Sequence, residues 1–274
     1  MSFETIRYEK RGPIGLLTLN RPDRLNAINQ KMLSEINSAL DSAEKDEDIR
    51  VIVVTGSGSA FSSGFDLKEQ MERHPTGVAD WRPLLDHDFN TVFRFWQFPK
   101  PTIAAVRGAC LAGACELALC CDLTIATDDA FFGEPELKFG AGIVVMILPW
   151  IVGPKIAKEI ILTGEDRLTA ARAREIGIVN QIVPLSELES AYLKLAKRIA
   201  IIDPNLVRQT KRAINRTFEI AGLGEALEAA LDIDLHIEGE GSPDKTQFME
   251  IARRNGLRAA LAWREQRFTK ATDR

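Results

Sequence analysis

Two glutamates with apolar neighbours are the side chains of this sequence best suited to proton transfer. Glu116 lies shortly after Gly113 in an apolar stretch, and Glu136 closes the segment Gly133-Glu134-Pro135-Glu136. Burial raises the pKa of a carboxyl group, and two carboxyl groups that face one site push their pKa values apart. Such a pair supplies both an acid and a base. The spacing alone also allows Glu116 to be a charge at a helix N-terminus, and Glu134 and Glu136 to lie on the surface.

Two glycine-rich loops precede predicted helices and offer backbone N–H groups. The first covers residues 56–67 (GSGSAFSSGFDL), and the second runs from Gly108 to Gly113. The first loop lacks the third glycine of a dinucleotide fingerprint and the Gly-Lys-Ser/Thr ending of a P-loop. The free N–H groups of a helix N-terminus can hold an anion or a developing oxyanion. An ordinary strand-to-helix turn is the structural alternative.

The elements that must position these groups follow an α/β pattern. Strands are predicted at residues 3–8, 14–19, 51–54, 102–106 and 123–126, and helices at 29–43, from about 66, and at 113–121. Asn29 is a plausible helix cap. Beyond about residue 185 only helices are predicted, at 186–200, 204–220, 223–238 and 245–262. We therefore predict a body of residues 1–202 and a helical C-terminal region of residues 203–274, with a mobile loop between Met71 and Pro83.

The overall composition excludes several classes of protein. The chain is 45% hydrophobic with a net charge of −4, so it lacks the basic excess of a nucleic-acid binder. Its apolar runs are too short to span a bilayer, and its N-terminus does not resemble a signal peptide, so we expect a cytoplasmic protein. The cysteines at 110, 115, 120 and 121 are interpreted as core residues, and neither disulfides nor a metal site are expected.

Several segments, in order along the chain, resemble the crotonase superfamily of enoyl-CoA hydratases and isomerases. They are residues 20–28 (NRPDRLNAI), 60–67 (AFSSGFDL), 100–122 with its Gly113 and Glu116, 133–136 (GEPE), and the later segments 162–164 (LTG) and 173–179 (AREIGIV). Single matches of this kind are weak, whereas the ordered set covers most of residues 5–185.

The resemblance implies a spiral of ββα turns, with a helical C-terminal region that assembles a homotrimer or a dimer of trimers. It implies an acyl-CoA thioester as substrate, with coenzyme A entering as part of the substrate and no separate cofactor. By position, the N–H groups of Phe65 and Gly113 would bind the thioester oxygen. Four residues would lie along the CoA moiety, namely Arg24, Ala27, Ser63 and Leu67. A surface arginine is the alternative reading of Arg24.

The implied reaction is syn addition of water to a 2-enoyl-CoA. Glu116 would activate the water and Glu136 would protonate the α-carbon. An isomerase would need only one acid–base carboxyl group, so the presence of both favours hydration. The alternatives are an isomerase, a dehydratase or a hydrolase on the same scaffold, or a non-catalytic protein that binds CoA or RNA.

Some segments depart from the family pattern. Residues 140–150 (GAGIVVMILPW) are bulky and short where hydratases usually carry glycines, so water placement and acyl specificity are open. Phe65 replaces a common small residue, and residues 244–256 resemble an insertion. Phe268 could cap the CoA site of a neighbouring subunit or lie in the core. The aromatic residues flanking the predicted mobile loop could line an acyl pocket or pack in the core: Trp81, Phe89, Phe93, Phe95, Trp96 and Phe98.

Overall fold

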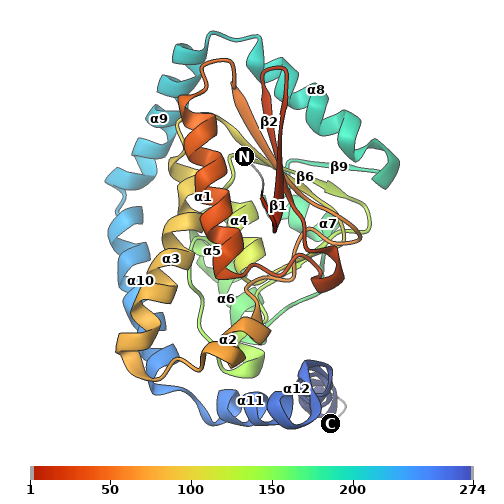
Figure 1. Ribbon diagram of the computed structural model, residues 1–274, viewed down its shortest axis with the longest axis vertical. Coiled ribbons are helices and arrows are strands. Elements are labelled where there is room, and N and C mark those ends of the chain that lie inside the picture. The colour runs from red at the N-terminus through yellow and green to blue at the C-terminus, as the bar shows by residue number, and fades with distance from the viewer. Residues whose placement is uncertain (1–2, 273–274) are drawn as a thin grey trace.

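The structure, a computed structural model, describes residues 3–272 and contains two sheets (Figure 1). The larger sheet has the strand order β1-β2-β3-β4-β6-β9, and the smaller has the order β5-β7-β8. The strands are β1 (Ile6–Arg11), β2 (Ile14–Leu19), β3 (Val51–Gly56), β4 (Thr102–Val106), β5 (Ala109–Leu111), β6 (Leu123–Thr127), β7 (Phe131–Gly133), β8 (Leu168–Thr169) and β9 (Gln181–Val183). The first strand starts three residues later than predicted, and the four other predicted strands are confirmed.

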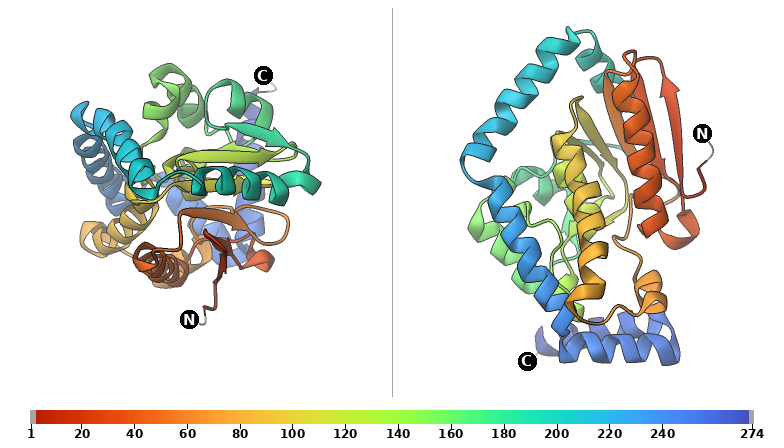
Figure 2. Two further views of the ribbon diagram at one scale, coloured as in Figure 1. Left: turned by 90° about the horizontal axis from the view of Figure 1, so that it is seen from above. Right: turned by 60° about the vertical axis from the view of Figure 1, so that its left-hand side comes forward.

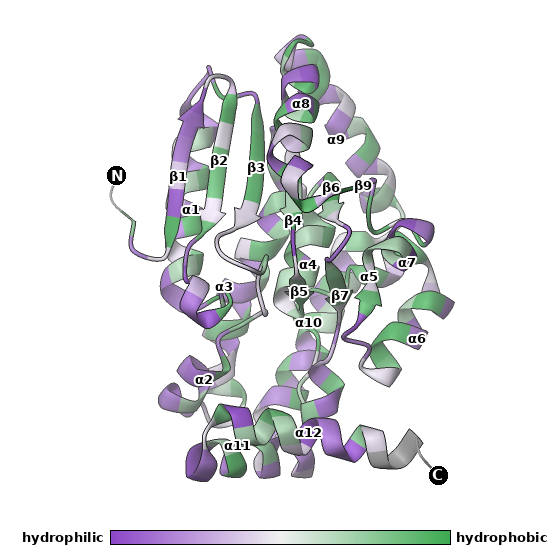
Figure 3. Cartoon of the chain, turned by 90° about the vertical axis from the view of Figure 1, so that its right-hand side faces the viewer, coloured by the Kyte–Doolittle hydropathy of each residue, from purple (hydrophilic) through white to green (hydrophobic). Residues whose placement is uncertain are grey.

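Continuous apolar runs form the centre of the larger sheet because both of its faces are covered. β2, β3, β4, β6 and β9 are parallel, and β3 is coloured hydrophobic along most of its length in Figure 3. Ile52 and Val54 pack in the core formed with α1 (Gln30–Lys45) and α3 (Gly77–Gln97). Val51 and Val53 face the other way, toward α8 (Leu188–Ala200). This two-sided burial explains why their pattern is continuous rather than alternating.

The two sheets are linked by successive turns of a spiral. The chain passes from β4 to β5 and α4 (Gly113–Cys120), and then from β6 to β7. An isolated bridge between Ser62 and Cys110 extends this arrangement to the first glycine-rich loop. As a result, loops that are about fifty residues apart in sequence lie side by side.

The other regular elements of residues 3–272 are helices. They are α2 (Leu67–Arg73), α5 (Leu148–Val152), α6 (Pro154–Thr163), α7 (Ala170–Glu175), α9 (Pro204–Ile220), α10 (Leu223–Glu240), α11 (Pro243–Asn255) and α12 (Leu257–Thr272), with short 3-10 turns η1 (Pro22–Arg24), η2 (Glu136–Phe139) and η3 (Leu185–Glu187). α9 and α10 run along one side of the body, and α11 and α12 lie across its end beside α2 (Figure 2). No helix of residues 3–272 is long and apolar enough to cross a membrane.

Two predictions about this region need correction. The segment between Met71 and Pro83 is mostly helical, because α2 continues to Arg73 and α3 begins at Gly77 with Pro83 inside it. The predicted helix 245–262 is two helices that meet at Gly256, whose φ of +86° suits glycine. A small separate core holds these two helices against the body, with Phe248 packed on Phe139.

Candidate active site

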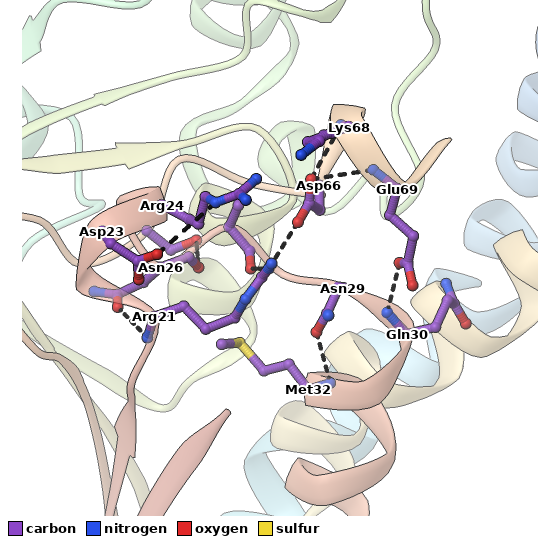
Figure 4. A network of polar contacts seen from close by, with 12 residues as sticks. Arg21, Asp23, Arg24, Asn26, Asn29, Gln30, Met32, Asp66, Lys68 and Glu69 are labelled. Carbon is purple, nitrogen blue, oxygen red and sulfur yellow. Dashed lines mark hydrogen bonds and ion pairs between the residues drawn. The ribbon is translucent and has the colours of Figure 1, made fainter. Parts of the chain in front are cut away.

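The first glycine-rich loop is fixed by the segment that precedes α1. The buried side chain of Asn26 donates to the carbonyl oxygens of Ser57 (2.8 Å) and Ala60 (2.9 Å). Arg21 Nη1 pairs with Asp66 at 2.7 Å, and Asp66 also caps α2 (Figure 4). The sequence signature at residues 20–28 therefore shapes the loop, a role that we did not assign to Arg21 or Asn26 from the sequence.

The second glycine-rich loop lies directly against the first. Ser62 N donates to Ala109 O at 3.0 Å, and Leu111 N donates to Ser62 O at 3.2 Å. Gly113 then begins α4 after Ala112, whose φ of +56° is unusual for a residue with a side chain. Among the described residues, the amides of Phe65 and Gly113 have no protein acceptor. The two loops thus offer two free N–H groups from neighbouring backbones.

Phe65 also contributes its ring. A methyl group on Gly113 would overlap this ring, so the ring of Phe65 lies against Gly113. A glycine is therefore required at 113 for steric reasons. The side chain of Phe65 lines the cavity described below and forms part of its wall beside the free amides.

Glu116 and Glu136 meet in space, and both are buried. Glu116, in the first turn of α4, accepts hydrogen bonds from Val144 N at 3.2 Å and Val145 N at 3.0 Å. Glu136 begins η2, and its Oε2 is buried without a hydrogen-bond partner among the described residues. Glu134 is buried too, and one oxygen from each of the three lies within 4.8 Å of the others. The surface alternative for Glu134 and Glu136 is therefore wrong.

Burial is the main cause of strong pKa shifts in this cluster. Desolvation, followed by repulsion from Glu136, raises the pKa of Glu116 well above its usual range, while the Val145 and Val144 amides oppose the rise. Desolvation raises the pKa of Glu136 to about 8. Desolvation and repulsion from Glu136 and Glu116 also raise the pKa of Glu134. Two amides favour the ionised form of Glu116, whereas Glu136 Oε2 has no such donor among the described residues.

Three carboxyl groups this close together could also bind a hard cation through their oxygens. Burial raises the pKa of all three carboxyl groups, which favours their protonated forms. We interpret the cluster as a group of carboxyl groups that share protons.

A cavity of about 620 Å³ adjoins this cluster. Six of the eight predicted site residues line it, namely Arg24, Ala27, Ser63, Phe65, Leu67 and Glu136. Gly113 and Glu116 are not among the residues that line it, whereas their neighbours Phe65, Ala112 and Val144 are. Arg24 keeps 44% of its side chain exposed, so it occupies the rim.

Helices supply cavity residues that the sequence analysis did not assign. α3 contributes Leu85 and Asp88, and α12 contributes Leu257, Leu261 and Arg264. Asp88 could have been noticed as a lone carboxylate on the apolar stripe of α3. Trp81, one of the aromatic candidates, lines the cavity, whereas Phe89, Phe93, Phe95 and Phe98 are buried in the main core.

Phe268, His74 and His87 make contacts with other residues of the chain. Phe268 lies under Lys138 Nζ, 5.3 Å from the ring centre, in its own chain. His74 contacts Arg253, and His87 contacts Gln30. Neither histidine lines the cavity.

Comparison with known proteins adds independent information. The profile of a family described as enoyl-CoA hydratase/isomerase matches residues 9–248. The crystal structure of an enoyl-CoA hydratase/isomerase from Xanthobacter autotrophicus Py2 is 64% identical, with a TM-score of 0.96 over 97% of this chain and 99% of that one. A probable mitochondrial enoyl-CoA hydratase of Dictyostelium discoideum is 40% identical, over 80% of this chain and 78% of that protein. The mitochondrial enoyl-CoA hydratase of Pongo abelii is 34% identical, over 93% and 88%.

Proposed function

Because the chain belongs to the enoyl-CoA hydratase/isomerase family, as its motifs predicted, we propose that it adds water to the double bond of a 2-enoyl-CoA thioester. The observation that carries this proposal is the pairing of two unlike carboxyl groups beside two free amides. Glu116 has both oxygens held by N–H groups, and Glu136 has an oxygen without a partner. Relatives named as enoyl-CoA hydratases support the same reaction.

In the proposed mechanism the amides of Phe65 and Gly113 bind the thioester oxygen. They stabilise the negative charge that develops there when water attacks the β-carbon, an effect typically worth ~10²–10³ in rate for each donor. Glu116 takes a proton from the water, and Glu136 gives its proton to the α-carbon, so that addition is syn. The thioester serves as the electron sink, so no further cofactor is required.

The CoA moiety would follow the rim of the cavity. Arg24 offers a cation there, and Ala27, Ser63 and Leu67 offer the adjoining wall. The mixture of a charged rim and an apolar interior suits a ligand with a phosphate-bearing end and an acyl end.

A second candidate reaction, double-bond isomerisation, has one observation in its favour. Glu136 lines the cavity, whereas Glu116 is not among the residues that line it. A single carboxyl group that lines the cavity would be sufficient to move one proton. The two reactions differ in their need for Glu116.

We further propose that residues 203–274 serve assembly, as a homotrimer or a dimer of trimers. α9 is amphipathic but buries none of its residues, and it leaves Leu206, Ile214 and Ile220 exposed. Ile201, just before it, is 85% exposed. Such a face needs a partner surface. Light scattering on the eluting protein should give a trimer or a hexamer, and a monomer at micromolar concentration would contradict this assembly.

The experiment that tests the function is turnover of short, branched and aromatic enoyl-CoA thioesters. The wild type should add water, and Glu116→Gln and Glu136→Gln should each lower kcat by ~10² or more, because each removes an acid–base group without changing shape. A wild type that only shifts double bonds, with Glu116→Gln still active, would establish the isomerase instead. Retained CoA binding without any turnover would exclude both enzymes.

A further inference from the structure

The loop that follows η2, residues 140–145, is connected to both candidate acid–base groups. Ala141 N donates to the carbonyl oxygen of Glu136 at 3.1 Å. Farther along, Val144 N and Val145 N donate to the two carboxylate oxygens of Glu116. The position of this loop therefore fixes the direction in which the Glu116 carboxylate points.

The other side of the same loop is held by α10 and α11. Glu238 Oε1 accepts from Gly142 N at 3.2 Å. The second carboxylate oxygen of Glu238 forms an ion pair with Lys245. Ser242, the N-cap of α11, donates through Oγ to Gly140 O at 3.3 Å. An unbroken series of contacts thus runs from Lys245 through Glu238 and Gly142 to the amides that hold Glu116.

The helices approach the loop so closely that side chains are excluded from it. A methyl group on Gly140 would overlap Ser242 Oγ and lie 2.8 Å from Lys245 N. A methyl group on Gly142 would overlap the carboxylate of Asp234. The two glycines are thus needed where the helices touch the loop, and the bulky residues Ile143, Val144 and Val145 follow only beyond that contact.

The ion pair in this series is buried, which is costly without a compensating role. Glu238 is 8% exposed and Lys245 is 9% exposed, and Lys245 Nζ also lies 4.2 Å from the centre of the Trp81 ring. Removal of one partner from a buried pair leaves an uncompensated charge. Apolar residues would give α10 and α11 the same packing, but they would not accept a hydrogen bond from Gly142 N.

We propose that Glu238 and Lys245 are positioning residues for Glu116, acting through the 140–145 loop. This proposal rests on the proposed function and deepens it. It also connects two segments in which the sequence departs from the resemblance, because Lys245 lies in residues 244–256, which resemble an insertion, and the loop that it supports lies in residues 140–150. α11 supplies the support that a bulky loop needs to present its amides.

The test compares Glu238→Ala, Glu238→Gln and Lys245→Met in the full-length protein. Glu238→Ala should lower kcat by ~10–10² with KM changed less than ~3-fold, because a small displacement of a catalytic group has effects of that size. Glu238→Gln keeps an acceptor for Gly142 N and should recover most of the loss. Lys211→Met is the matched control, since it removes a lysine whose side chain is only 9% exposed, which pairs with Asp122 (2.7 Å) and does not contact the loop. Its kcat should equal that of the wild type.

A double-mutant cycle separates positioning from general damage to the fold. In a Glu116→Gln background, Glu238→Ala should cost less than ~2-fold further, because the group that it positions is already absent. An equal loss in both backgrounds would overturn the proposal, as would a wild-type kcat in Glu238→Ala.

Hydrogen exchange keeps the proposal testable whatever reaction the protein catalyses. The amides of residues 142–145 should exchange at least ~10-fold faster in Glu238→Ala than in the wild type, while those of β3 stay unchanged. Unchanged protection of residues 142–145 would overturn the positioning role of Glu238 even if the wild type is a hydratase. Faster exchange in a protein that does not add water would support the positioning role of Glu238. It would reject only the proposed function.

Discussion

Two walls enclose the cavity, and they are built from different kinds of group. The loop wall comprises the segments around residues 24–27, 63–67, 109–112 and 135–144, and it offers backbone amides and Glu136. The helical wall comprises Trp81, Leu85 and Asp88 of α3, Glu238 of α10, and Leu257, Leu261 and Arg264 of α12, and it offers side chains. The position of a backbone N–H group is fixed by the fold, and added atoms beside it cause overlap. A side chain, in contrast, can be replaced by substitution without a change in the backbone. The loop wall thus suits the reaction, and the helical wall suits the shape of the acyl group and the support of the loop.

The largest expected effect is at Gly113 on the loop wall. Gly113→Ala keeps the N–H group but forces the new methyl group into the ring of Phe65. We expect kcat to fall by ~10² or more, the loss typical of one oxyanion donor. Steady-state kinetics on the preferred enoyl-CoA will check this.

The overlap with Phe65 also suggests a control for the Gly113→Ala variant. If crowding against the ring is the cause, Phe65→Ala combined with Gly113→Ala should recover at least ~10-fold of the lost kcat. A double variant no better than Gly113→Ala would show that the ring is not responsible. Full activity of Gly113→Ala would remove this amide from the reaction altogether.

The next effect is the pH dependence of the reaction, which the loop wall should control. Glu136 must hold its proton to act as the acid, and its pKa is raised to about 8 by burial. We expect kcat/KM to fall about tenfold per pH unit above that value, since the proton-bearing fraction falls in that way. A profile from pH 6 to 10 will test this. Glu136→Gln should lack the alkaline limb, and a wild type that stays flat to pH 9.5 would contradict the assignment.

The loop wall could largely be predicted from sequence because its information is local. The continuous run 51–54 indicated a strand buried on both faces, and the glycines indicated the loops. Glu116 and Glu136 were expected to share a site only through the family resemblance, and the structure brings them together. The burial of Glu134 was missed because the alternation of residues around it does not distinguish a surface turn from a core.

The helical wall could not be predicted because its contacts join distant segments. Glu238 meets Gly142 across 96 residues. Helical periodicity identified α10 but gave no indication of its partner. The segment between Met71 and Pro83 was predicted as a loop from its polar composition, yet packing of α3 against α10 and α4 stabilises most of it as helix.

The smallest expected effect belongs to the helical wall and concerns stability. Burial raises the pKa of Asp88 from 3.8 to about 7. The folded protein therefore keeps a proton that the unfolded chain releases between about pH 4 and 7. The free energy of unfolding should fall as pH rises through that window, by at most about 1.4 kcal/mol per pH unit for this group. Urea unfolding at several pH values measures the slope.

Asp88→Asn removes this titration while Gln30 Nε2 can still donate to the side-chain oxygen, as it does to Asp88 at 2.7 Å. Its stability should depend less on pH between 4 and 7 than that of the wild type. Asp86→Asn, at a half-exposed position of the same helix, should give the wild-type slope. Equal slopes in wild type and Asp88→Asn would show that Asp88 is ionised in the folded protein. The helical wall would then present a negative charge to the acyl group. The distinction between a loop wall that carries the reaction and a helical wall that only shapes the acyl site would no longer hold.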